Sequence, residues 1–403
     1  MSIDIMKERG TPLDKQEFDW RDLVQTPYSK LDDDAYTRVR VILMNGIESE
    51  AVRFGHACAR MNGALQLPLA RVRRIEHHQQ TLVNWLNPPD QSVLETTLGF
   101  EQVAIDITAT LAQNEPDPYL KQVLDFGLLE DFDHLYRYSA LMDRVEGLDP
   151  NNITQCYTDI LPGRPTSVEH RAPEDDLRAH YDRSRAEPIS KLNCLIITAA
   201  EHQTHDYYMT VGPTYSDPVG RQLYAEIASI EEQHVTQYEC VIDPNETWLE
   251  KWLLHEVSEV YAYYSCARQE PNPRLKAIWE RFVDYELGHV HVVMDLMKKI
   301  EKRDPAELLP ATLPTPIDFS SQRKYVREVL ATQVDFRAKG KEIVTLEEDS
   351  AASIAYRERM NRAGSPSERV AAGYRWRPGT ELNTAGLGGN GNGNGKKTQQ
   401  VTR

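Results

Sequence analysis

Two glutamate–histidine pairs in this chain of 403 residues have the spacing of neighbours on one face of a helix. Glu231 and His234 lie in "IASIEEQHVTQYE", and Glu286 and His289 lie in "WERFVDYELGHVHVVMDLM". Residues three apart on an α-helix project from the same face. A carboxylate and an imidazole on one face form a ligand pair for a transition-metal ion. One such pair occurs by chance on many helices, but two pairs indicate a site.

Each pair is preceded by another glutamate at the same distance. Glu201 stands 30 residues before Glu231, and Glu256 stands 30 residues before Glu286. This separation fits a helix, a turn and a return to the same height. Four carboxylates inside a helical bundle would repel one another unless cations neutralise them, and two divalent ions supply the matching charge. We therefore expect one intact di-metal site in the second half of the chain.

Three more side chains lie close to these glutamates on the same predicted helices. Glu259 follows Glu256 by one turn, so it is either an extra metal ligand or an ordinary surface carboxylate. His205 shares the face of Glu201, and Tyr263 lies one turn beyond Glu259. His205 and Tyr263 are candidates for hydrogen-bonding neighbours of the ligands, with plain structural packing as the alternative for both.

The chain contains an internal repeat. Residues 75–142 align with residues 230–297 at a constant offset of 155 and without a gap. About a quarter of the aligned positions are identical, as an old duplication would leave. The upstream helices align after a shift of two residues, which pairs Glu48 with Glu201. The chain is therefore two copies of one helical unit.

The first copy supplies an altered set of candidate ligands, namely Glu48, Glu76, Gln79, Glu101, Asp131 and His134. Gln79 replaces a histidine, and Asp131 replaces a longer glutamate. Ala104 stands at the position of Glu259. An amide oxygen is a weak ligand for iron or manganese, and a shorter side chain reaches less far. We expect a degenerate site in a structural partner bundle, with loose binding of two ions as the alternative.

These residues all fall in predicted helices, and four antiparallel helices joined by short turns form a bundle. We predict an all-α fold with two tandem four-helix bundles, at 35–145 for the degenerate site and at 187–302 for the intact site. The remaining segments are an N-terminal arm (1–34), a connector (146–186), a Pro-rich and helical extension (303–363) and a Gly/Asn-rich tail (364–403). The tail is predicted to be disordered because its composition cannot build a core.

Composition excludes several classes of protein. A formal net charge of −16 argues against binding to nucleic acid. No apolar run approaches the roughly 20 residues that span a bilayer. The first residues lack the apolar core of a secretory signal. The five cysteines are scattered, without a C-x-x-C pair, as expected for reduced thiols of a cytoplasmic protein.

The motifs described above resemble those of the ferritin-like di-iron carboxylate superfamily, which includes rubrerythrins and di-iron oxidases. The resemblance covers residues 187–300 strongly and 35–145 more weakly. It implies a cofactor of two iron ions, with manganese as an alternative. By this resemblance Glu231 and Glu286 bridge the metals, Glu201 and Glu256 are terminal ligands, His234 and His289 each cap one metal, and Glu259 is the extra glutamate of rubrerythrin-type sites.

The resemblance implies an oxidoreductase that activates O₂ or peroxide, as an oxidase or oxygenase acting on a small molecule. A rubrerythrin-like peroxidase is a close alternative, and without paired cysteines it needs a separate electron donor. A second class of function is iron handling, as a ferroxidase or metal-binding protein, which the negative charge favours. A helical scaffold that keeps the acids without binding metal is a third. A homodimer is among the expected assemblies, and particle size separates storage from an oxidase, because a storage cage is far larger than a dimer.

Overall fold

The computed structural model describes residues 3–309 and 312–377, and it confirms the all-α class. The α-helices of the described residues are α1 (Trp20–Leu23), α2 (Ala35–Met61), α3 (Gln66–Asn84), α4 (Val93–Asn114), α5 (Pro118–Val145), α6 (Asn151–Thr154), α7 (Pro188–Val211), α8 (Pro218–Cys240), α9 (Trp248–Gln269), α10 (Pro273–Ile300), α11 (Arg323–Gln333), α12 (Ala351–Met360) and α13 (Pro366–Ala371). Two strands, β1 (Arg337–Lys339) and β2 (Glu342–Val344), form an antiparallel hairpin. Short 3₁₀ turns, such as Leu13–Lys15 in the arm, link several helices.

The starts of the long helices repeat at the offset of 155 residues. Ser92 begins α4 and Thr247 begins α9, and each takes part in a capping box with the glutamate three residues later. Asp117 before α5 and Asn272 before α10 each accept backbone N–H bonds and precede a proline at the first helical position. Equivalent residues therefore fix the beginnings of equivalent helices in both copies.

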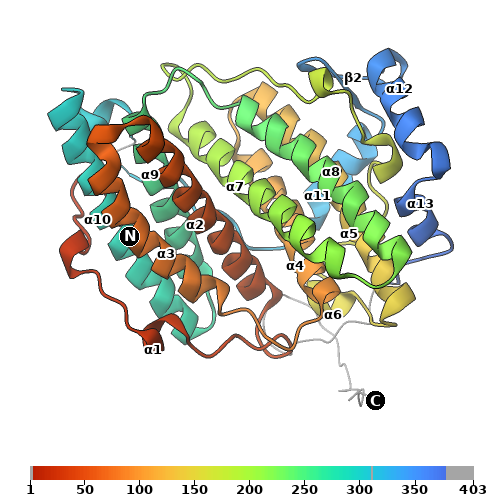
Figure 1. The fold of residues 1–403 in the computed structure, drawn as a ribbon, viewed down its shortest axis with the longest axis horizontal. Helices are drawn as coiled ribbons and strands as arrows, with labels where there is room; N and C mark the ends of the chain where they lie inside the picture. The colour runs from red at the N-terminus through yellow and green to blue at the C-terminus, as the bar shows by residue number, and fades with distance from the viewer. Residues whose placement is uncertain (1–2, 310–311, 378–403) are drawn as a thin grey trace.

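The eight long helices form four hairpins that pair across the repeat. The hairpin α2–α3 of the first copy packs with α9–α10 of the second, and we call these four helices bundle B. The hairpin α4–α5 packs with α7–α8, and we call these bundle A. Figure 1 shows bundle B on the left and bundle A to its right. The prediction that each copy folds into its own bundle is therefore wrong.

Long-range contacts fix this exchanged pairing. The amide of Gln203 on α7 donates to the backbone carbonyl of Ile42 on α2, at 2.9 Å. A Cβ atom at Gly46 would lie 2.6 Å from that amide, so α2 and α7 approach closely only because residue 46 has no side chain. Arg40 on α2 pairs with Glu270 after α9 at 3.2 Å, and both side chains are buried. The contact of Gln203 with Ile42 links the two bundles, and the contact of Arg40 with Glu270 lies within bundle B. Both contacts connect residues from different copies of the repeat.

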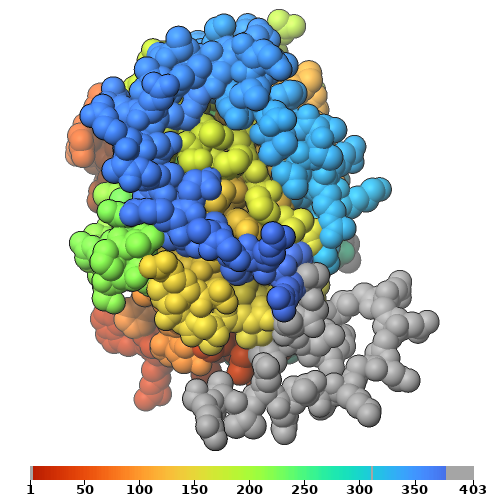
Figure 2. Space-filling model, turned by 90° about the vertical axis from the view of Figure 1, so that its right-hand side faces the viewer, coloured from red at the N-terminus to blue at the C-terminus, as the bar shows by residue number. Residues whose placement is uncertain are grey.

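The connector and the part of the extension from α11 onward lie together over bundle A (Figure 2), whereas Thr315 and Ile317, earlier in the extension, contact α9 of bundle B. Ser353 of α12 donates to Asp175 of the connector, at 2.5 Å. Residues 364–377 belong to this cover, since α13 packs on α5 and α8 and the backbone N–H of Ser367 donates to Glu226. The prediction of a disordered tail is therefore wrong for 364–377, and its remainder, 378–403, lies outside the described residues.

Two further expectations concern the chain as a whole. In the described part of the chain, none of the helices combines the length and the hydropathy that a bilayer crossing requires. All five cysteines carry free thiols, and Cys58, Cys194 and Cys266 are buried.

Candidate metal centres

Six candidate ligands meet in the middle of bundle A. Site A consists of Glu101 from α4, Asp131 and His134 from α5, Glu201 from α7, and Glu231 and His234 from α8. Each side chain is at most 1 % exposed. The site therefore combines one carboxylate from each of two helices with an acid-x-x-His pair from each of the other two. Half of these residues come from each copy of the repeat.

Site A divides into two ligand groups that overlap. One group is Glu101, Asp131, His134 and Glu231, and the other is Asp131, Glu201, Glu231 and His234; within each, the ligand atoms all lie within 4.8 Å of one another. Asp131 and Glu231 belong to both groups. Each group offers three carboxylates and one imidazole, and the two shared carboxylates lie where they could bridge a pair of ions. Four carboxylates in total match two divalent cations.

Buried carboxylates fix the orientation of both imidazoles. His134 Nδ1 lies 3.1 Å from Glu231 Oε1, and its Nε2 lies 2.9 Å from Glu169 Oε2 in the connector. His234 Nδ1 lies 3.2 Å from Glu231 Oε2, and its Nε2 lies 2.7 Å from Glu130 Oε2. A proton held on each Nε2 by a carboxylate leaves Nδ1 free to face a metal and makes it more basic. Sequence reasoning did not single out Glu130 or Glu169.

The oxygens of site A fit a metal better than they fit the protein alone. The carboxylate oxygens Glu101 Oε2, Asp131 Oδ1, Asp131 Oδ2, Glu201 Oε1 and Glu201 Oε2 are buried and have no hydrogen-bond partner in the described residues. A buried, unsatisfied carboxylate oxygen costs several kcal/mol unless a cation compensates it. His234 Nδ1 lies 3.3 Å from Asp131 Oδ1 and 3.5 Å from Glu201 Oε2, so one imidazole faces two of these oxygens. Mixed carboxylate and imidazole donors suit iron or manganese. Site A thus passes a test of fit for a di-metal centre.

When metal is absent, bound protons neutralise part of the negative charge of the site A carboxylates. Burial raises the pKa of Glu101 and Glu201 well above the usual range. Burial also acts on Glu231, but hydrogen bonds with His134 and His234 outweigh it and set the pKa at about 2. Burial lowers the pKa of both histidines, yet the surrounding carboxylates raise it well above its usual value. Both imidazoles of the metal-free site A therefore favour the protonated form, and a metal ion would have to displace a proton from each Nδ1.

Seven residues form the corresponding cluster in bundle B. Site B consists of Glu48 from α2, Glu76 and Gln79 from α3, Glu256 and Glu259 from α9, and Glu286 and His289 from α10. Two ligand groups have atoms within 4.8 Å: Glu76 with Glu256 and His289, and Glu48 with Glu259 and Glu286. Unlike the groups of site A, these two share no residue. Site B therefore has two halves with different donors, and Glu286 joins them, since its Oε2 lies 2.9 Å from His289 Nδ1.

Glu259 belongs to site B and not to the surface. It is 1 % exposed, and neither of its carboxylate oxygens has a hydrogen-bond partner in the described residues. Burial raises its pKa well above the usual range, and Glu286 and Glu256 add to the effect. The reading of Glu259 as an ordinary surface carboxylate is wrong. Site B consequently holds five carboxylates where site A holds four.

The N-terminal arm fixes the imidazole of site B. His289 Nδ1 lies 2.9 Å from Glu286 Oε2, and His289 Nε2 lies 2.7 Å from the amide oxygen of Gln16. The arm reaches this depth because Gly288 carries no side chain; a Cβ atom there would lie 2.1 Å from the carbonyl oxygen of Thr11. Gln16 therefore orients His289 through its Nε2, as Glu169 orients His134, although the Gln16 side chain carries no charge.

Tyrosines hold one carboxylate in each site, and one candidate lies elsewhere. Tyr263 donates its hydroxyl to Glu48 in site B, and Tyr208 donates to Glu101 in site A, at 2.5 Å. His205 lies at the surface with 29 % of its side chain exposed, and its Nδ1 faces Asp206 at 3.3 Å. The prediction that His205 stands behind the ligands is therefore wrong.

The grouping of the predicted ligands also needs correction. The expected set of Glu201, Glu231, His234, Glu256, Glu286 and His289 is divided between the two bundles. The residues of the first copy complete both sites, so they do not form a degenerate site of their own. Asp131 and His134 contribute to site A, while Gln79 contributes to site B. The predicted bridging pair of Glu231 and Glu286 is separated, and Glu231 shares its site with Asp131.

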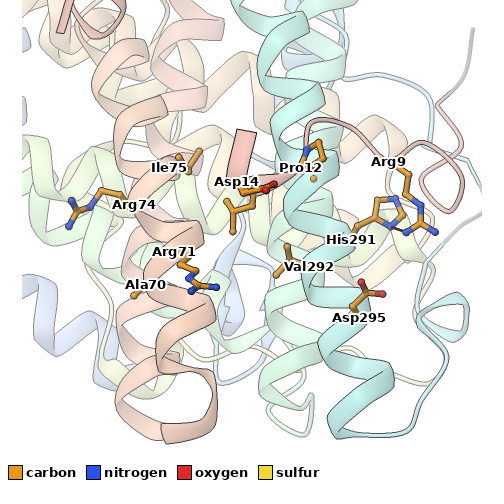
Figure 3. Close-up of a pocket in the computed structure, with 12 residues that line it drawn as sticks. Arg9, Pro12, Asp14, Ala70, Arg71, Arg74, Ile75, His291, Val292 and Asp295 are labelled. Atoms are coloured by element: carbon orange, nitrogen blue, oxygen red, sulfur yellow. Dashed lines mark hydrogen bonds between the residues drawn. The ribbon is translucent and has the colours of Figure 1, made fainter. Parts of the chain in front are cut away.

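A large cavity near these helices lies away from both sites. It has a volume of about 990 Å³ and lies between α3 and α10 beside the arm, with Asp14 of the arm between the two helices and Arg71 reaching from α3 toward α10 (Figure 3). Its lining includes no acid or imidazole of site A or site B. A narrow crevice lined by Phe54 and His255 does reach Glu76 and Glu256, and a cavity of about 280 Å³ shares Phe54 and His255 with it.

Comparison with known proteins gives no match to a family model, to a curated protein or to a solved structure.

Proposed function

We propose that this chain is a ferritin-like oxidoreductase with a di-metal centre in site A, loaded with two iron ions or with iron and manganese. The single observation that carries the proposal is the pair of carboxylates, Asp131 and Glu231, shared between two ligand groups that each end in an imidazole. The unsatisfied oxygens of Asp131 and Glu201 support it, because their burial is costly without a cation.

The chain's own residues would hold the centre and keep it dry. When bound, the two metals supply electrons to O₂ or peroxide and a Lewis acid that polarises the bound oxygen atoms. Glu130 and Glu169 keep the two imidazoles oriented and their Nε2 atoms protonated. The Tyr208 hydroxyl holds one oxygen of Glu101 and leaves the other free. The packed helices exclude water from these groups.

Burial favours a small oxidant over a bulky organic substrate. All six side chains of site A are at most 1 % exposed, so a large molecule reaches them only if helices move apart. O₂ and hydrogen peroxide are small enough for transient openings. An oxidase or a rubrerythrin-like peroxidase is thus favoured over an oxygenase of large substrates. Scattered free cysteines provide no rubredoxin-like centre in the described residues, so a separate donor supplies electrons, in keeping with a reducing cytoplasm.

One surface feature favours iron handling as a second candidate function. Glu50, His202 and Glu239 place ligand atoms within 4.8 Å of one another, with His202 Nδ1 at 2.6 Å from Glu50 Oε2. Glu50 and Glu239 also line the cavity of about 280 Å³ that adjoins the crevice leading to site B. In this function ferrous iron is the substrate and is oxidised inside, and the stacked rings of Phe54 and His255, with centroids 4.4 Å apart, must separate to admit it.

Oxygen and peroxide consumption test the proposal. The metal-free chain is loaded anaerobically with Fe²⁺, with and without the paired substitution Asp131→Asn and Glu231→Gln, and is then exposed to O₂ or H₂O₂. We expect the wild-type chain to consume oxidant and to cycle when a reductant is added, and the paired variant to lose most of this activity. A wild-type chain that takes up no metal overturns the proposal. If the chain oxidises many Fe²⁺ ions and does not cycle when a reductant is added, iron handling is assigned instead.

A further inference from the structure

The two halves of site B offer different donor atoms. Glu76, Glu256 and His289 provide two carboxylates and an imidazole, whereas Glu48, Glu259 and Glu286 provide carboxylates alone. In site A both ligand groups contain an imidazole. This difference arises from two positions: Gln79 stands where site A has His234, and Glu259 adds a carboxylate where α4 of site A carries Ala104, three residues after Glu101.

Gln79 belongs to the half without the imidazole. Its side chain is fully buried, and its Nε2 donates to Glu286 Oε1 at 2.5 Å. Its Oε1 has no hydrogen-bond partner in the described residues, nor do both oxygens of Glu259 and one oxygen of Glu48. These unsatisfied atoms are all oxygens. The half therefore forms an oxygen-only donor set of three carboxylates and one amide.

Donor type separates the metals that each half would prefer. Imidazole suits iron, whereas carboxylate, carbonyl and water oxygens suit manganese, magnesium and calcium. For any one donor set Fe²⁺ generally binds more tightly than Mn²⁺, so discrimination depends on the donor atoms and their geometry. An oxygen donor in place of an imidazole therefore weakens the preference of a site for iron over manganese.

Resting on the proposed di-metal function, we propose that site B is a mixed-metal centre, in which Glu48, Glu259, Glu286 and Gln79 take manganese while Glu76, Glu256 and His289 take iron. Site A offers the same donors, three carboxylates and one imidazole, in each half, so its donor atoms do not assign different metals to the two halves. The chain then holds two centres of different composition, and Gln79 and Glu259 are the residues that determine the difference.

The test isolates site B in the full-length chain. The paired substitution Asp131→Asn and Glu231→Gln disables site A, and the metal-free chain is loaded anaerobically with equal Fe²⁺ and Mn²⁺. Elemental analysis then counts each metal, and anomalous diffraction at the iron and manganese edges locates it. We expect about one manganese and about one iron per chain, with manganese beside Glu259.

Two substitutions in this background separate donor chemistry from loss of fold. Gln79→His restores the imidazole that His234 provides in site A, and Glu259→Ala copies Ala104. Each is expected to lower the ratio of manganese to iron several-fold while iron beside His289 persists. Two irons per chain before any substitution, or a ratio that neither substitution changes, overturns the mixed-metal proposal while leaving a di-metal site in place. If site B takes up no metal, the mixed-metal proposal is overturned and bundle B is not a metal-binding bundle. The metal content of site A, measured in the chain without Asp131→Asn and Glu231→Gln, tests the proposed function separately.

Discussion

His134 Nδ1 on α5 lies 3.1 Å from Glu231 Oε1 on α8, and these two residues belong to different copies of the repeat. Neither copy can therefore build site A alone. An acid-x-x-His pair from each copy faces the other across bundle A, so the duplication created a complementary pair of hairpins inside one chain. The functional unit is the exchanged bundle and not the sequence repeat.

Glu169 supports site A without being a ligand, which predicts a graded effect. Glu169→Gln replaces the carboxylate that receives the Nε2 proton of His134 by a neutral group of the same size. Removing such a partner typically lowers metal affinity by about 10- to 100-fold. Titration with Fe²⁺ or Mn²⁺ should show this loss in site A while site B is unchanged. Glu174→Gln, at an exposed position of the same connector, is the matched control and should leave both sites intact.

Neutralising Glu201 should stabilise the metal-free chain in a pH-dependent way. Burial raises its pKa well above the value of 4.5 expected in the unfolded chain. Its stabilising contribution is therefore complete below pH 4.5 and is lost as the pH rises through the folded pKa. Glu201→Gln removes this loss, so the melting temperature of the metal-free variant should exceed that of the wild type by about 2 °C or more at pH 8.

The same comparison at pH 5 provides the control for Glu201. Wild-type Glu201 is protonated there, so the difference in melting temperature between variant and wild type should shrink or vanish. A difference of equal size at both pH values would show that the carboxylate charge is not its cause. When metal is bound, the wild type should have the higher melting temperature, because the variant has lost a metal ligand.

Metal uptake by site A should release protons. His134 and His234 have pKa values raised well above the usual range, so both imidazoles carry a proton at neutral pH in the metal-free chain. A metal ion must displace the proton on each Nδ1. Apparent affinity should therefore fall as the pH is lowered from 8 to 6, and a weakly buffered indicator should report acidification on adding metal. Uptake without acidification contradicts the proposed protonation.

The arm should control site B through Gly288. A Cβ atom at this position would lie 2.1 Å from the Thr11 carbonyl oxygen and 2.9 Å from the Gln16 amide. Gly288→Ala should displace Gln16 from His289 and weaken metal binding in site B by about 10-fold or more, leaving site A unaffected. Gly63→Ala, where an added Cβ meets nothing within 4 Å, is the control. If Gly288→Ala and Gly63→Ala change metal binding in site B equally, the arm does not control that site.

Much of the fold could be predicted from local sequence patterns. Capping residues such as Ser92 and Thr247, together with apolar periodicity, mark where the helices begin and which faces are buried. The acid and imidazole spacings identified the candidate ligands of both sites. These signals depend only on residues within a few turns of one another.

The pairing of hairpins could not be predicted in the same way. Hairpins of equal length and equal ligand spacing bury the same faces whether they pair within a copy or across copies. The choice rests on long-range contacts such as Gln203 with Ile42 and Arg40 with Glu270, which no local period reveals. Glu169 and Gln16 were missed because they lie in an irregular connector and an irregular arm. Only their distance from the imidazoles in the folded chain identifies them.

The most direct test of the account is to count metals in two variants, each lacking two imidazoles. His134→Gln with His234→Gln removes both imidazoles of site A, whereas His234→Gln with His289→Gln removes one from each site. After anaerobic loading we expect about four ions per wild-type chain and about two in the first variant, with site B intact by anomalous diffraction. The second variant should be impaired in both bundles. If instead the second variant loses one whole centre and keeps the other, the ligands group by sequence repeat, and the exchanged sites described above are contradicted.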